Sequence, residues 1–246
     1  MHYAGGKSLI CKKLAPIIRA YRKPGQLYIE PFCGAVSVFK LMDNPRIGGD
    51  LNAYIPALWS AVRDGWEPPE EIDEAEYYRI RASMDSYPPE LVGYAMVALS
   101  YGGNFADIFC KNALGYDYQQ SGINSIRKRR PLLQGAEFVA GAYTQFSAVR
   151  DALFYCDPPY RNTAQKGYQS TVFDSAAFWD WCRIMAARGN TMIVSEYSAT
   201  DFAREIAAIP VSKKISMSLK THQIKIERVY LVGDAEPLYG QQELFT

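Results

Sequence analysis

Apolar residues at helical spacing and short β-prone runs alternate along the first fifty residues. Residues 8–22 repeat apolar positions with helical spacing, so we expect a helix that ends before Pro24 and Gly25. Two short strands are expected at 27–29 and at 46–50. Between them we expect a tight turn at 30–34 and a helix from about Ser37. This order of strand, turn, helix and strand predicts an α/β fold with a doubly wound sheet.

The middle of the chain, 52–135, has a different pattern, dominated by helical periodicity. Its expected elements are helices over 53–63, 73–84 and 90–101, a polar and aromatic loop over 102–122, and a basic segment over 124–130. We therefore expect a helical insertion at 52–135 within one α/β domain that is made of 1–51 and 136–246.

The α/β pattern resumes near Ala152. Expected are strands at 153–156 and 192–195, helices at 174–189 and 200–209, and a final strand pair around 211–215 and 227–232. Asp174 is a plausible N-cap of the first of these helices, and Gly189 is a plausible residue to end it.

Composition excludes several classes of protein. The chain has 246 residues, of which 48% are hydrophobic and 22% charged, as in an ordinary globular protein. No apolar run approaches the roughly 20 residues of a membrane-spanning helix, and the N-terminal region lacks the apolar stretch of a secretory signal. The five cysteines form no C-x-x-C pair, which favours a reducing cytoplasm over a disulfide framework or a zinc site. With only two histidines, a metal centre and a Ser/His/Asp triad are not expected.

Charge is segregated along the chain although the formal net charge is only +1. Residues 1–29 hold six basic side chains and no acidic one, and residues 64–90 hold nine acids against two arginines. Residues 110–150 are basic again, with four consecutive cations at 127–130. This distribution fits a basic face for a polyanion, and on charge alone it fits a solvated helix surface equally well.

Asp157-Pro158-Pro159-Tyr160 is the most specific motif, directly after the apolar run 153–156. In an open α/β sheet, residues that follow a strand line the ligand site. The Asp157 carboxylate and the Pro158 carbonyl can accept both hydrogens of an exocyclic aromatic amine, and the prolines fix these acceptors in advance. Tyr160 offers a flat face for an extruded base. The alternative is a rigid turn in which Asp157 only caps the chain.

A second motif, Glu30-Pro31-Phe32-Cys33-Gly34-Ala35-Val36-Ser37, also follows a strand. Its glycine permits close approach of backbone to a ligand. Asp50 ends the next strand, where nucleotide-binding folds place an acid for ribose hydroxyls. The alternative for Asp50 is an N-cap of the helix that follows.

The third motif is Tyr3-Ala4-Gly5-Gly6-Lys7-Ser8. It is not a phosphate-binding P-loop, because the required first glycine and the preceding strand have no place in the chain. Taken alone, it reads as a flexible basic arm.

Together, in this order, the three motifs resemble those of the Dam-like DNA adenine methyltransferases, especially the smaller phage-type members. The segments 99–105 and 195–198 share this resemblance, which extends over almost the whole chain. It implies adenine-specific methylation of double-stranded DNA, as in phages and restriction–modification systems, with S-adenosylmethionine as methyl donor, no metal and no obligate protein partner. We expect a cytoplasmic monomer.

The resemblance also implies roles for individual residues. Asp157, Pro158 and Tyr160 would hold a flipped adenine. The residues implied to bind the cofactor are Tyr3, Ala4, Gly5, Lys7, Glu30, Pro31, Phe32, Gly34, Asp50 and Asp157. The commoner family form has a second glycine where this chain has Val36, so we expect weakened rather than abolished cofactor binding.

Other reactions fit the residues less well. Methylation of a cytosine ring carbon needs a cysteine that follows a proline, and none of the five does. Enzymes that methylate the cytosine amine typically carry serine in place of Asp157, and glutamine methyltransferases usually carry Asn-Pro-Pro-Tyr and lack the insertion. A silent DNA-binding protein with the same fold would have no need of the intact Asp-Pro-Pro-Tyr motif.

The expected DNA contacts lie in the insertion. Its cations Lys111, Arg127, Lys128, Arg129 and Arg130 are candidates to neutralise phosphates, or belong to a solvated helix end. Its aromatic residues either touch bases or pack the insertion's own core; they are Tyr101, Phe105, Tyr116 and Tyr118.

Overall fold

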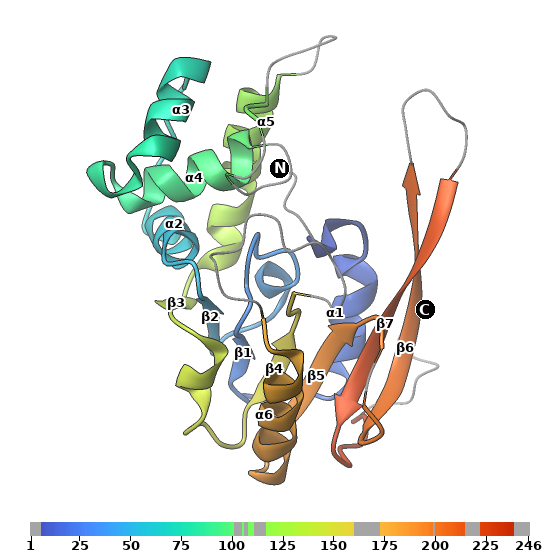
Figure 1. Ribbon diagram of the computed structural model, residues 1–246. Coiled ribbons are helices and arrows are strands. Elements are labelled where there is room, and N and C mark those ends of the chain that lie inside the picture. The colour runs from blue at the N-terminus through green and yellow to red at the C-terminus, as the bar shows by residue number, and fades with distance from the viewer. Residues whose placement is uncertain are drawn as a thin grey trace.

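A computed structural model of the chain describes residues 6–100, 105, 108–110, 117–159, 173–198, 200–214 and 222–238. Its centre is a seven-stranded sheet with the order β3-β2-β1-β4-β5-β7-β6 (Figure 1). The strands are β1 (Tyr28–Glu30), β2 (Arg46–Asp50), β3 (Glu137–Ala140), β4 (Leu153–Cys156), β5 (Thr191–Glu196), β6 (Ala203–Lys214) and β7 (His222–Val232). Neighbouring strands from β3 to β5 are parallel, and β7 runs antiparallel to β5 and β6.

The expected α/β fold with a doubly wound sheet is confirmed. Strands β1, β4 and β5 are buried along their whole length, as in a parallel sheet covered on both faces. Their side chains alternate between two hydrophobic cores. Leu153 and Tyr155 point into the core beneath α1 (Cys11–Arg19), while Phe154 and Cys156 point to the face covered by α6 (Ser175–Ala187).

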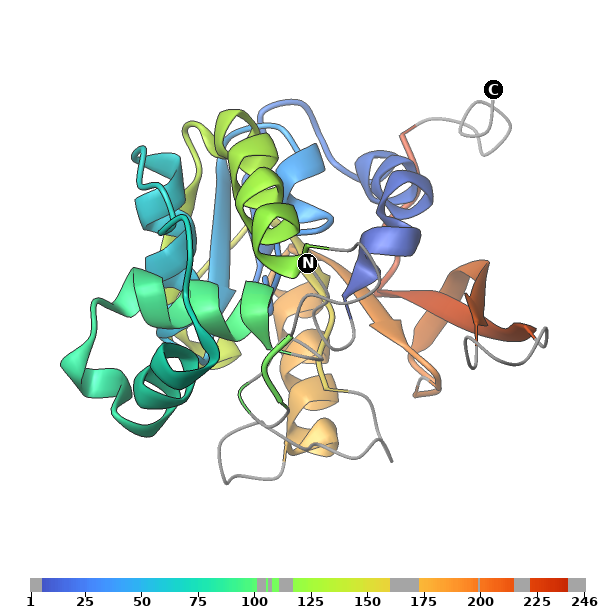
Figure 2. The same cartoon turned by 90° about the horizontal axis from the view of Figure 1, so that it is seen from above.

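The helices between β2 and β3 gather on one side of the sheet (Figures 1 and 2). They are α2 (Tyr54–Arg63), α3 (Glu74–Ala82), α4 (Pro89–Leu99) and α5 (Tyr118–Arg129). Short 3-10 turns lie at Lys7–Leu9, Phe39–Leu41, Met84–Ser86, Arg130–Leu133 and Tyr143–Phe146. The apolar residues of α2, α4 and α5 pack in the same core as those of α1 and of one sheet face.

Aspartates begin three of the helices. The carboxylates of Asp73, Asp117 and Asp174 each accept a backbone N–H three residues ahead, which satisfies a donor that the helix itself leaves unpaired. The expected N-cap at Asp174 is therefore confirmed. Gly189 follows the last residues of α6 with a φ of 90°, a conformation that favours glycine.

The helix expected over 200–209 is wrong, because this segment forms the edge strand β6. Phe202, Ile206 and Ile209 have helical spacing, which explains the error. Tertiary pairing decides instead: β6 pairs along its whole length with β7, with a register shift between Glu205 and Ala207. Pro210 is tolerated because an edge strand does not need every amide hydrogen.

Smaller differences affect three other segments. The helix expected from Ser37 is only a 3-10 turn at Phe39–Leu41, and α5 already begins at Tyr118, within the expected loop. Strand β3 was not predicted, since its four residues show no clear alternation and are only partly buried. Among the described residues, no helix is both long and apolar enough to cross a membrane.

Candidate active site

Three acidic residues mark the carboxyl ends of neighbouring parallel strands. Glu30 ends β1, Asp50 ends β2, and Asp157 directly follows β4. Because β2, β1 and β4 are adjacent in the sheet, these acids lie along one edge, where open α/β sheets bind their ligands. The sequence motifs that contain them therefore meet at one place.

Lys7 joins this edge from the turn before α1. Its Nζ lies 2.6 Å from Oδ1 of Asp157 and 3.3 Å from Oε1 of Glu227 on β7. The Lys7 side chain is only 7% exposed. Burial lowers the pKa of Lys7, but the two carboxylates outweigh this effect and the net shift is upward. The cluster therefore holds a buried ammonium beside two carboxylates.

Glu30 is buried deeper in the same edge. The Tyr28 hydroxyl donates a hydrogen bond of 2.5 Å to Oε1 of Glu30. Burial raises the pKa of Glu30 to about 8, further raised by the charge of Asp157 and opposed by the Tyr28 hydrogen bond. Glu30 is therefore mostly protonated at neutral pH and adds little negative charge to the site.

Replacing Glu30 by Gln should stabilise the fold at pH 8 and flatten its pH dependence. The folded-state pKa lies above the unfolded one, so the wild-type stability falls as pH rises from about 5 to 8, by a few kcal/mol in order of magnitude. Glutamine keeps the acceptor for the Tyr28 hydroxyl without a titratable proton. Urea unfolding of both proteins between pH 5 and pH 8 measures the effect, with the exposed Glu70→Gln as control. An unchanged slope in Glu30→Gln would contradict the prediction.

Asp50 organises the turn after β1. Its Oδ2 accepts the N–H of Gly34 at 3.1 Å, and its Oδ1 accepts the N–H of Asn52 at 3.0 Å. Burial raises the pKa of Asp50 to about 6, against the effect of these two hydrogen bonds. The bond to Asn52 is a local turn contact and not the N-cap that was the alternative for Asp50, because the N-cap of α2 is Ala53. The bond to Gly34 links Asp50 to the second motif.

The turn itself has an unusual backbone. Gly34 has a φ of 43° and Val36 a φ of 50°. The second value is rare for a β-branched residue and is the conformation that a glycine adopts easily, so Val36 strains the turn. The Val36 side chain is fully buried in the core, so it does not face an open site. The weakened cofactor binding expected from Val36 stays a prediction.

Trp59 of α2 fixes the same turn from the other side. Its indole Nε1 donates a hydrogen bond of 2.7 Å to the carbonyl of Gly34. Gly34 thus has both backbone polar groups engaged, its N–H by Asp50 and its C=O by Trp59. The first helix after β2 therefore holds the turn in place.

The carboxyl groups at this edge of the sheet suit S-adenosylmethionine. This cofactor carries a sulfonium, an amino group and ribose hydroxyls, all of which pair with carboxylates. Each oxygen of Asp50 accepts one backbone N–H, and a carboxylate oxygen has capacity for a second hydrogen bond. The buried carboxylate of Asp50 and the positive-φ turn at Gly34 fit such a ligand, and the largely neutral carboxyl group of Glu30 adds a hydrogen-bonding group.

The remaining predicted cofactor and catalytic residues divide into two groups. Pro31, Pro158 and Phe32 belong to the described chain, and the Phe32 ring packs against Tyr143 and Phe178 with centroids 5.8 and 5.7 Å apart. The predicted site residues that lie outside the described residues are Tyr3, Ala4, Gly5, Tyr160 and Lys111.

The four consecutive cations have different environments. Arg127 and Lys128 are exposed, and Arg127 pairs with Glu67 at 3.0 Å. Arg130 pairs with Glu67 at 2.6 Å and donates to the carbonyl of Trp66. Arg129 is 8% exposed, with its guanidinium 5.9 Å from the Trp59 ring and bonded to Ser125. The structure thus leaves Arg127 and Lys128 at the surface and places Arg129 inside.

The aromatic residues of the insertion also differ. Phe105 packs against Tyr77 of α3, with ring centroids 5.5 Å apart, so it belongs to the core of the helical segment. Tyr118 begins α5 and is partly exposed. Tyr101 and Tyr116 lie outside the described residues.

Sequence reasoning missed one site residue, Glu227. It lies 70 positions after Asp157 in the numbering and belongs to no motif. Its signal is a charged side chain at an inward position of a strand, since Val229 and Leu231 on the same face of β7 are core residues. The alternation becomes readable only when the strand register is known.

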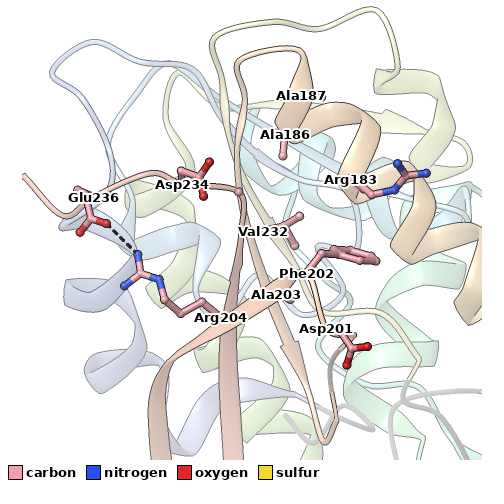
Figure 3. A pocket seen from close by; sticks show the side chains of 11 residues that line it. Arg183, Ala186, Ala187, Asp201, Phe202, Ala203, Arg204, Val232, Asp234 and Glu236 are labelled. Carbon is pink, nitrogen blue, oxygen red and sulfur yellow. Dashed lines mark hydrogen bonds and ion pairs between the residues drawn. The ribbon is translucent and has the colours of Figure 1, made fainter.

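A separate hollow of about 660 Å³ lies at the other end of the outer strands (Figure 3). It is lined by α6 and by the residues around the start of β6 and the end of β7, including Arg183, Phe202 and Arg204. Val232 lies at this end of β7, whereas Glu227 lies toward the end where Lys7 and Asp157 meet. The hollow is thus distinct from the acidic edge, by which we mean the carboxyl ends of β1, β2 and β4 with Glu30, Asp50 and Asp157.

Comparison with solved structures finds methyltransferases of low sequence identity. An rRNA methyltransferase, aviRa, from Streptomyces viridochromogenes has 11% identity and a TM-score of 0.41, covering 90% of this chain and 84% of that one. A precorrin-6y C5,15-methyltransferase from Geobacter metallireducens has 9% identity and a TM-score of 0.41, covering 94% of each chain. Likeness at this level says nothing about substrate. A comparison with curated protein sequences finds no match.

The family profile described as D12 class N6 adenine-specific DNA methyltransferase matches residues 3–217. The match includes all three motifs and the helices between them. The matched residues make up more than half of the chain. The chain belongs to the family of D12 class N6 adenine-specific DNA methyltransferases.

Proposed function

We propose that this enzyme methylates an adenine turned out of the DNA duplex. In this proposal the Asp157 carboxylate accepts a hydrogen bond from the amino group of the adenine. The observation that carries the proposal is the placement of Asp157: it follows a central buried strand and bonds to Lys7 at 2.6 Å. Enzymes that modify a base of duplex DNA take that base out of the stack, so we propose extrusion here. The smaller phage-type enzymes are the members whose motifs this chain resembles most.

Asp157 and Pro158 act as paired acceptors in this scheme. The carboxylate of Asp157 and the carbonyl of Pro158 each accept one hydrogen of the adenine amine. The lone pair of the nitrogen is then drawn out of the ring and toward the methyl group. S-adenosylmethionine supplies that methyl group as the electrophilic substituent of a sulfonium.

In the proposed reaction the methyl group passes directly to the amino nitrogen, without a covalent enzyme intermediate. The amino nitrogen forms a bond to carbon and loses one proton, and the carbon–sulfur bond breaks with its electron pair left on sulfur. Asp157 accepts the hydrogen bond of the departing proton, which passes on to water. Tyr160 gives the base a face to stack on.

The proposed cofactor residues follow from the same edge. Glu30, Pro31, Phe32 and Gly34 surround the turn, and Asp50 offers its carboxylate to ribose hydroxyls. Lys7 lies at this edge, and we propose that Tyr3, Ala4 and Gly5 of the same motif also bind the cofactor. We propose no metal. Calorimetric titration with S-adenosylmethionine tests this assignment, and no detectable binding would contradict it.

Two experiments test the reaction and the extrusion. Expression in a host that lacks adenine methylation, followed by direct sequencing of its genome, should show N6-methyladenine at one short sequence. With that sequence known, 2-aminopurine in place of the target adenine should become more fluorescent when the enzyme binds. Modified cytosine, or no modification, would contradict the proposed reaction, and unchanged fluorescence would contradict the extrusion.

We also propose a division of labour along the chain. Residues 1–51 and 136–246 form the catalytic part, and 52–135 form the part that recognises the target. The helices α2 to α5 support this assignment because they group together on one side of the sheet (Figure 2). The enzyme is proposed to act as a monomer in the cytoplasm, and its five cysteines are free and buried, as suits a reducing compartment.

Exposed cations near the end of α5 are proposed to contact DNA phosphates. Lys128 is the clearest candidate, because Arg127 and Arg130 share Glu67 and Arg129 is buried. Lys111 is a further candidate from the sequence. Phosphate contacts act without regard to base sequence.

Replacing Arg127 and Lys128 together by alanine should weaken DNA binding to all sequences alike. Each lost phosphate contact should reduce the slope of log affinity against log salt by about one. Lys128→Ala alone should account for most of the change, because Arg127 is held by Glu67. Fluorescence anisotropy at several salt concentrations measures the effect, with Arg183→Ala on α6 as control. A loss confined to one base position would instead identify base readers.

A further inference from the structure

Glu227 reaches the active site from the antiparallel strand β7. Along β7, Val229 and Leu231 point into the same core as Tyr155 of β4, and Glu227 continues their alternation. Asp157 follows Tyr155 by the same step of two residues. Both carboxylates thus lie on one face of the sheet, and the ammonium of Lys7 lies at 2.6 Å from the first and 3.3 Å from the second.

The charges of these three groups do not cancel. One ammonium faces two carboxylates, so the cluster carries a net charge of −1. If Lys7 paired with Asp157 alone, the pair would be neutral, and the carboxylate would be a weaker acceptor for any further hydrogen. A second carboxylate on the same ammonium takes up part of its charge.

We propose that Glu227 is a positioning residue for methyl transfer that shares the ammonium of Lys7 and so keeps Asp157 a strong acceptor for the substrate amine. The proposal rests on the role assigned above to Asp157. Glu227 does not touch the reacting atoms in this scheme. It acts through Lys7, which it also helps to hold in place against the end of β4.

Among the described residues, three further titratable groups near Asp157 add little charge at neutral pH. Burial raises the pKa values of Tyr155 and Cys156 on β4 well above their usual range, and it raises that of Glu30 on β1 to about 8. The neighbours of Glu227 in β7, Ile226 and Arg228, alternate to the opposite face. Within the described part of the chain, Lys7 and Glu227 therefore dominate the charge around Asp157.

The two possible roles of Glu227 have opposite signatures. If Glu227 shares the ammonium, Glu227→Gln removes one of its carboxylate partners and one negative charge, and the pKa of Asp157 falls. If Glu227 only holds Lys7 in position, its loss frees Lys7, and the pKa of Asp157 rises. The ammonium lies only 2.6 Å from Asp157, so its departure should outweigh the lost charge of Glu227, and the direction of the shift separates the two roles.

The first measurement needs neither cofactor nor DNA. In the full-length protein labelled with carboxyl-¹³C aspartate, the Asp157 signal is assigned by its loss in Asp157→Asn and followed by NMR against pH. We expect a lower pKa in Glu227→Gln, and a pKa nearer to the wild type in Glu227→Asp, which retains the charge. Glu205→Gln is the matched control, because Glu205 pairs with Arg228 at an exposed position on the same hairpin.

The second measurement is the pH profile of kcat. Glu227→Gln should lower kcat about three- to tenfold, move the acid limb to lower pH and leave the KM for DNA unchanged. An unchanged or raised pKa of Asp157 in a folded Glu227→Gln protein would overturn the proposal. A lowered pKa in Glu227→Gln together with full activity of Asp157→Ala would instead refute the catalytic role of Asp157 and leave the charge sharing intact.

Discussion

Replacement of Asp157 by alanine is expected to lower kcat by about 10²- to 10³-fold, the usual cost of removing one preorganised polar group from an active site. The amine would lose the stronger of its two acceptors, and its lone pair would stay delocalised in the ring. DNA binding should be largely retained, because the exposed cations proposed to contact DNA belong to α5, where Arg127 and Arg130 pair with Glu67.

The measurement is single-turnover methylation on a mapped target site, together with DNA affinity by anisotropy. Asp157→Asn serves as a second variant, because it keeps the size of the side chain and one acceptor oxygen. It should retain more activity than Asp157→Ala. Near-normal turnover of a folded Asp157→Ala protein would refute the assignment.

Replacement of Lys7 by methionine is expected to destabilise the fold by about 3–5 kcal/mol, as when one partner of a buried ion pair is removed. The Lys7 side chain is 7% exposed and its two carboxylate partners are 20% and 10% exposed. Without the ammonium, Asp157 and Glu227 would repel each other in a poorly hydrated place.

The effect should depend on pH in a defined direction. The folded-state pKa of Lys7 is raised above its usual 10.5, so its contribution is complete below that value and is lost as pH rises through the folded-state pKa. In Lys7→Met the repulsion between the Asp157 and Glu227 carboxylates should be relieved as acid protonates them, so the difference from wild type should shrink at low pH.

Urea unfolding at pH 4 and pH 7 measures this difference. The matched control is Lys13→Met on α1, since Lys13 is exposed and its loss should change stability by no more than about 0.5 kcal/mol. Equal stability of Lys7→Met and wild type at pH 7 would contradict the prediction.

Strands and motifs were the part of the fold that the sequence revealed best. The runs that became β1, β4 and β5 are short and apolar, and each is buried in the sheet. Asp50 and Asp157 follow strands whose ends could be read from the chain, and topology alone brings such ends to one edge. The acidic edge was therefore predictable before any contact was known.

Pairing between distant segments was not predictable in the same way. β6 has a helical spacing of apolar residues, and only its partner β7 reveals it as a strand. Glu227 has the same difficulty, because its approach to Lys7 depends on the register of β7 in the sheet. The buried position of Arg129 also escaped prediction, since four cations in a row read as surface until the helix face is known.

The outer margin of the sheet has a consequence for how the protein behaves in a crowded solution. Among the described residues, β6 is hydrogen-bonded to another strand on one side only, and such an edge can pair with a strand of another chain and begin a fibre. Pro210 has no amide hydrogen to donate to a strand of another chain. Pairing there would also desolvate the exposed side chains of Arg204 and Glu205. These features of β6 thus disfavour pairing between copies of the chain, which is compatible with the proposed monomer.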